Sequence, residues 1–72
     1  MILIFAIRNI EACHFARQKG FNNKDWKYVG SADALRGILS TDLYVLSDAR
    51  SHRNFDEVIL MAKTRFMNII YE

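Results

Sequence analysis

The sequence has little of what usually stabilises a very small protein or marks its location. Its 72 residues include one cysteine, Cys13, so an internal disulfide is excluded, and no Cys or His residues are spaced as zinc ligands. The apolar N-terminal run, residues 1–7, is far shorter than the ~20 residues of a membrane span and lacks a signal peptide's basic leader and cleavage site. We therefore expect residues 1–72 to form one cytoplasmic domain without cofactor, metal or membrane association.

Neither sign of charge is in large excess. The formal net charge is +2, which is too small to indicate nucleic-acid binding from composition alone. Apolar residues make up 51% of the chain and charged residues 25%, as in ordinary folded domains. A chain of this length buries only ~60% of its unfolded surface, so it needs support from a disulfide, a metal or a partner. Because the first two are not expected, the composition predicts self-association.

The apolar pattern predicts strands that alternate with helices. The strands expected at residues 2–7 and 42–47 have continuous apolar centres, which is typical of strands buried on both faces. The other two are mixed in character and belong at the edges of a sheet, at residues 25–30 and 68–72. Three helices are expected between the strands, capped by Asn9, Ser31 and Asn54 and starting at residues 10, 32 and 55. The second, at residues 32–39, is weakened by Gly37.

This order of elements predicts a small α/β fold of three layers. Strands joined by helices form parallel sheets with right-handed crossovers. With the two apolar strands at the centre, the strand order is 2-1-3-4, with the first helix on one face and the other two on the opposite face. Ligands of such sheets bind at the switch point, outside the carboxyl ends of the first and third strands. The residues expected there are Arg8, Asn9, Ser47, Asp48 and Arg50.

Three segments resemble parts of P-loop ATPases of the helicase and phage-terminase type. "LRGILSTDLYVLSDA" is similar to the segment that enters their Walker B strand, and "MILIFAIRNIEACHFARQKG" to the strand and helix that follow the phosphate-binding helix. "MNIIYE" resembles the next strand, and the whole chain resembles small α/β proteins encoded by bacteriophages. The resemblance implies that Asp48 stands where the family holds magnesium through water.

The departures from that family predict that the protein is not an enzyme. The three glycines do not form the G-x-x-x-x-G-K-[ST] loop, so nothing cradles the phosphates. Ala49 follows Asp48 where the family usually has a second acid to orient the attacking water. The resemblance, if it reflects descent, therefore implies a remnant core that has lost ATP hydrolysis.

A basic loop follows the third strand and is expected near Arg8. Its basic residues are Arg50, His52 and Arg53. These side chains could bind a phosphate or a nucleic-acid backbone. The alternative, which is commoner for surface arginines and which we favour, is a solvated loop whose arginines pair with Asp48 and Asp33.

The third helix predicts a surface for a partner. Apolar residues at helical spacing define a face toward the sheet, namely Phe55, Val58, Ile59, Ala62 and Phe66. At ~100° per residue, Leu60 and Met61 point away from that face, and exposed apolar pairs often mark partner contacts. The second helix could cover one of the pair but hardly both. A two-fold dimer through Leu60 and Met61 is the expected assembly.

Two functions follow as expectations. The first is a non-catalytic interaction protein that self-associates through the third helix and could bind a host or viral protein, in the host cytoplasm if the chain is viral. The alternative is a module that binds an anion, a nucleotide or nucleic acid in the crevice at the carboxyl ends of strands one and three.

Overall fold

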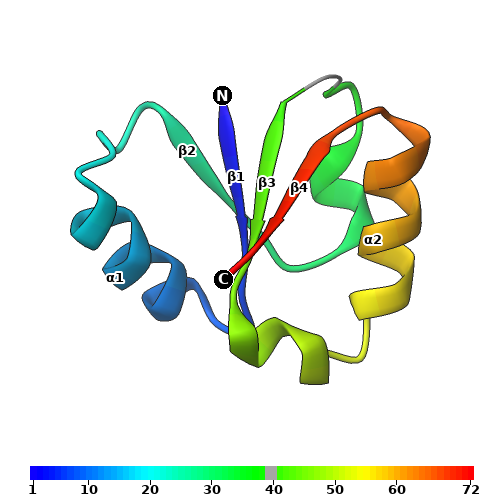
Figure 1. Cartoon of the computed structure of the whole chain (residues 1–72), viewed down its shortest axis with the longest axis horizontal. Coiled ribbons are helices and arrows are strands. Elements are labelled where there is room, and N and C mark those ends of the chain that lie inside the picture. The colour runs from blue at the N-terminus through cyan, green and yellow to red at the C-terminus, as the bar shows by residue number, and fades with distance from the viewer. Residues whose placement is uncertain (39–40) are drawn as a thin grey trace.

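Four parallel strands form a sheet of order β2-β1-β3-β4 in the computed structural model, which describes residues 1–38 and 41–72 (Figure 1). The strands are β1 (Ile2–Phe5), β2 (Trp26–Val29), β3 (Asp42–Val45) and β4 (Asn68–Tyr71). They pair in step, so that Phe5 lies opposite both Val29 and Val45, and Val45 lies opposite Tyr71. The predicted order and parallel direction are confirmed.

Two α-helices lie on opposite faces of this sheet, as predicted (Figure 1). They are α1 (Asn9–Lys19) and α2 (Phe55–Thr64). The helix predicted at residues 32–39 is instead a short 3-10 helix, η1 (Ala32–Leu35), which ends where Arg36 becomes extended and Gly37 adopts a φ of 75°. Residue 39 of that predicted helix lies outside the described residues. A second 3-10 helix, η2 (Ser47–Ser51), follows β3 at a position where no helix was expected.

The helix starts differ in detail from the predicted caps. Arg8 takes the N-cap position of α1, and Asn9, expected there, is the first helical residue. Asn54 does occupy the N-cap of α2. Its side chain, however, donates a hydrogen bond of 3.2 Å to the Gly30 carbonyl, so it ties α2 to the end of β2. The cap of α2 therefore acts as a tertiary link.

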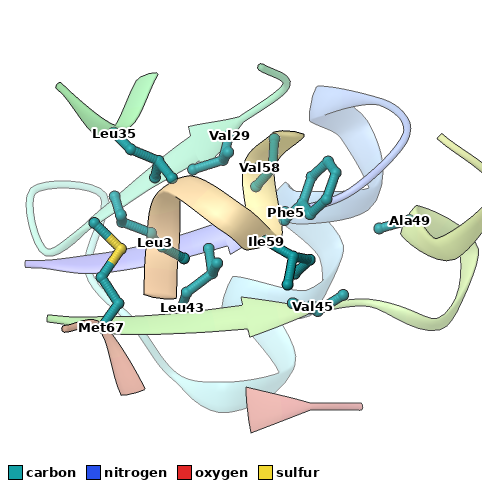
Figure 2. Packing of buried hydrophobic residues seen from close by; sticks show 11 residues of the cluster. Leu3, Phe5, Val29, Leu35, Leu43, Val45, Ala49, Val58, Ile59 and Met67 are labelled. Atoms are coloured by element: carbon teal, nitrogen blue, oxygen red, sulfur yellow. The ribbon is translucent and has the colours of Figure 1, made fainter. Parts of the chain in front are cut away.

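The core has one cluster on each face of the sheet, because the side chains of β1 and β3 alternate between the two faces. Leu3 and Phe5 point toward α2, whereas Ile4 and Ala6 point toward α1, and all four are fully buried. Figure 2 shows the larger cluster, in which Val58 and Ile59 reach from α2 toward the strands. Each buried side chain of this size contributes about 1.5–3 kcal/mol to folding.

The position of β2 at the edge of the sheet explains its mixed composition. Its residues alternate, so that Trp26 and Tyr28 pack against the α1 cluster while Val29 joins the α2 cluster. Lys27 is exposed, as expected for a lysine on an edge strand. The Tyr28 hydroxyl donates to the carbonyls of Ala6 and Ile7 at 3.2 and 3.1 Å, which fastens the edge strand to the end of β1.

Both α-helices end in the same backbone motif but with different residues. At the end of α1, the amides of Gly20 and Phe21 donate to the carbonyls of Arg17 and Ala16, and Gly20 has a φ of 76°. This is the Schellman arrangement, in which glycine is favoured at the left-handed position.

At the end of α2 the left-handed position is held by Phe66, with a φ of 59°. The amides of Phe66 and Met67 donate to Lys63 and Ala62 in the same pattern. The expectation that Phe66 faces the sheet is wrong, because α2 ends at Thr64 and this turn leaves the ring 82% exposed.

Candidate functional site

Side chains from α1, η2 and the C-terminus line a hollow of about 410 Å³ near the carboxyl end of β3. We call it the switch-point hollow, and its polar lining residues are Glu11, His14, Gln18, Lys19, Ser47, Asp48 and Glu72. Ser47 and Asp48 reach it because they begin η2 directly after Leu46. Glu72 reaches it because its amide continues the β3–β4 pairing, donating to the Val45 carbonyl. The predicted position of Ser47 and Asp48 at the switch point is thus the observed one.

Arg8 and Arg50, which were expected at the switch point, contact other residues. The Nε of Arg8 lies 3.6 Å from the Glu11 carboxylate, and the Arg8 side chain is 72% exposed. The guanidinium of Arg50 lies 5.2 Å from the centre of the Tyr71 ring, a cation–π distance. The structure therefore places Arg8 at the start of α1 and Arg50 over the end of β4. The pairing of Arg50 with Asp48, which the solvated-loop interpretation expected, is replaced by this ring contact.

His52 contributes to packing, whereas its neighbour Arg53 is exposed. The His52 ring lies 5.4 Å from the ring of Phe5, between centroids, and its Nδ1 accepts a hydrogen bond of 3.0 Å from the Asn54 amide. His52 thereby shapes the turn between η2 and α2. Of the basic loop, Arg53 alone stands in solvent without such a contact among the described residues.

The charge of the switch-point hollow is mainly acidic. Three carboxylates line it, from Glu11, Asp48 and Glu72, against one ammonium group from Lys19, which lies 3.9 Å from Glu72. Arg8 offsets the charge of Glu11 and Lys19 that of Glu72, so the excess negative charge of the hollow comes from Asp48. Across residues 1–38 and 41–72, no group of three or more His, Cys, Asp or Glu side chains is arranged to hold a metal ion. The solvated-loop interpretation also expected an arginine of the basic loop to pair with Asp33. Asp33 instead pairs with Arg36, whose Nε lies 3.5 Å from the Asp33 carboxylate.

A second hollow, of about 420 Å³, lies between α1 and β2 and was missed by the sequence analysis. Asn9 lines it, together with Cys13, Arg17 and Trp26, whereas Asp48 lines the switch-point hollow. Cys13 is half-buried. The Nε1 of Trp26 is buried and has no hydrogen-bond partner among the described residues. The sequence could not indicate this unpaired N–H group, because a buried Trp N–H usually finds a hydrogen-bond partner.

A third depression lies on α2 and includes both predicted interface residues. This α2 groove has a volume of about 300 Å³ and is lined by Ala32, Glu57, Leu60, Met61 and Thr64. Leu60 is 68% exposed, as predicted for a side chain that points away from the sheet. Met61 differs from the prediction, because it is half-buried, packs against the α2-side core and accepts a hydrogen bond from Arg65 Nε at 3.4 Å. The exposed apolar centre of α2 is therefore Leu60.

Comparisons with protein-family models, with curated proteins and with solved structures found no match to this chain. Among the described residues, the helices are too short and too polar for any of them to traverse a lipid bilayer.

Proposed function

We propose that this protein is a non-catalytic cytoplasmic interaction protein that self-associates through the outer face of α2. The observation that carries the proposal is Leu60, whose side chain is 68% exposed at the middle of an otherwise well-packed helix. The sheet takes up Val58, Ile59 and Ala62 from the other side of α2, so no rotation of the helix would bury Leu60 as well. Covering it with a partner contributes about 1.5–3 kcal/mol per copy, which is large for a marginal domain.

The absence of catalysis is part of the same proposal. Its support is the missing phosphate-binding loop, together with Ala49 in place of a second acid. The resemblance of residues 35–49 to a Walker B segment, and the phage origin that goes with it, stay predictions; a viral chain would act in the host cytoplasm and could meet a host protein there.

The alternative, an anion or nucleotide site at the carboxyl ends of β1 and β3, has weaker support. Such a site needs cations that converge, and Arg8 and Arg50 contact Glu11 and Tyr71 instead. The acidic lining of the switch-point hollow opposes it further.

Sedimentation equilibrium tests the proposal with a matched pair of variants. Leu60→Lys places a charge on α2, and Ile10→Lys makes a similar change on α1, where Ile10 is 53% exposed. Between about 10 µM and about 1 mM, we expect the wild type and Ile10→Lys to associate and Leu60→Lys to remain monomeric. A wild type that stays monomeric, or equal weakening by both substitutions, would refute the proposal.

A further inference from the structure

The outer face of α2 carries a charge pattern that is symmetric about Leu60. Glu57 precedes Leu60 by three residues and Lys63 follows it by three, and both are exposed. Asp56 precedes Leu60 by four residues and Thr64 follows it by four, and both are also exposed. At ~100° per residue, Asp56 and Lys63 lie on one side of the line along which Leu60 points, and Glu57 and Thr64 lie on the other side.

From this pattern we infer that two copies pair through α2 in antiparallel orientation, with a two-fold axis that passes through Leu60. The inference rests on the proposed self-association and adds its geometry. Such an axis reverses the direction of the helix but keeps each flank of the Leu60 line on the same side. Asp56 of one copy then lies beside Lys63 of the second copy, and the symmetry repeats the pair, giving two opposite-charge contacts.

The alternatives fit the charges less well. In a parallel pair, the flank of one helix that carries Asp56 would face the flank of the other that carries Glu57, so like charges would meet beside Leu60. The antiparallel pair instead sets Glu57 of one copy beside the Thr64 hydroxyl of the other. Both residues line the α2 groove, so the grooves of the two copies meet on that flank.

The size of the contact sets the expected strength. α2 has 10 residues and is therefore about 15 Å long, so the helix pair alone is smaller than the ~800 Å² per partner of a standard stable interface. We accordingly expect a weak, reversible dimer whose population depends on concentration and, through the charge pairs, on salt.

Charge reversal tests the geometry directly. Asp56→Lys and Lys63→Glu each replace two attractive contacts with two repulsive ones, so each should weaken the homodimer roughly tenfold. The double variant, Asp56→Lys with Lys63→Glu, restores both pairs with the charges exchanged and should dimerise like the wild type. An equimolar mixture of the two single variants should form a heterodimer in preference to either homodimer.

The control is Lys24→Glu, which makes the same charge change as Lys63→Glu. Lys24 belongs to the segment between α1 and β2, which Figure 1 shows on the opposite side of the molecule from α2. Its dimerisation should match the wild type, and circular dichroism should show that every variant is folded.

The results separate this inference from the proposed function. If the wild type dimerises but the double variant is as weak as the single variants, and the mixture forms no heterodimer, the antiparallel arrangement is overturned while self-association stands. If the wild type stays monomeric up to about 1 mM, both are overturned.

Discussion

The two helix ends predict opposite effects of two substitutions on stability. Gly20 and Phe66 occupy the same left-handed position of the same motif, with φ values of 76° and 59°. A left-handed conformation is disfavoured by ~1–2 kcal/mol for residues with a Cβ, and glycine avoids this strain. Gly20→Ala should therefore destabilise the protein, and Phe66→Gly should stabilise it.

At both sites, the change in stability should come mainly from the backbone conformation rather than from side-chain packing. A Cβ added to Gly20 would meet no atom within 4 Å in the described part of the chain, so packing contributes little. The Phe66 ring is 82% exposed, so few contacts are lost with it. Glycine also raises the conformational entropy of the unfolded chain, which offsets ~0.4–1 kcal/mol of the strain energy. The expected net change in the free energy of unfolding is therefore about 1 kcal/mol at each site. For a domain of this size, each substitution should move the Tm by about 4–8 °C.

Thermal unfolding followed by circular dichroism measures both changes, at a low concentration where the wild-type Tm no longer depends on concentration. Phe66→Ala is the matched control, because it removes the ring but keeps a Cβ in the left-handed conformation. Its Tm should stay close to that of the wild type. If Phe66→Ala and Phe66→Gly raise the Tm equally, the exposed ring rather than the backbone is the source of instability, and the reasoning fails.

Three further substitutions test the core, the β2 edge and the switch point. Leu43→Ala removes a fully buried side chain of β3 and should destabilise by about 2–5 kcal/mol, so that a cooperative melting transition retained near the wild-type Tm would contradict the assigned core. Gly30→Ala places a Cβ 3.0 Å from the Tyr28 hydroxyl, which must then shift from the carbonyls it binds; we expect a loss of about 1 kcal/mol in urea unfolding, matched by Tyr28→Phe. Asp48→Ala changes an exposed side chain without an ion pair among the described residues, so stability should stay within about 0.5 kcal/mol of wild type. Neither the wild type nor Asp48→Ala should release phosphate from ATP with magnesium, and turnover by the wild type that is lost in Asp48→Ala would show that the protein is an enzyme.

The strand order was predictable because burial on two faces leaves a signal in every residue of a strand. β1 alternates between two separate clusters and yet is apolar throughout, whereas Lys27 marks β2 as an edge. These features are local, so they can be read without knowledge of the rest of the chain. Gly20 is a similar case, since glycine is the residue that the end of α1 requires.

The side-chain partners at the switch point were not predictable, because each depends on a distant segment. Arg50 contacts Tyr71 only because β4 pairs with β3 in a register that brings Tyr71 beside Val45. The end of α2 was missed for another reason: the apolar spacing continues to Phe66, and no glycine marks the stop. Periodicity alone cannot detect a helix that ends at a residue poorly suited to the turn.

The length of η1 connects the local sequence to the proposed interface. A full second helix beside α2 would cover its flank, but η1 ends at Leu35, where Arg36 becomes extended and Gly37 turns the chain. This single short turn packs beside α2, with Ala32 forming one wall of the α2 groove. Of the two apolar residues predicted to point away from the sheet, Met61 packs against the α2-side core and Leu60 stays exposed. In the proposed dimer, the shortness of η1 helps to leave Leu60 exposed for a second copy to bury.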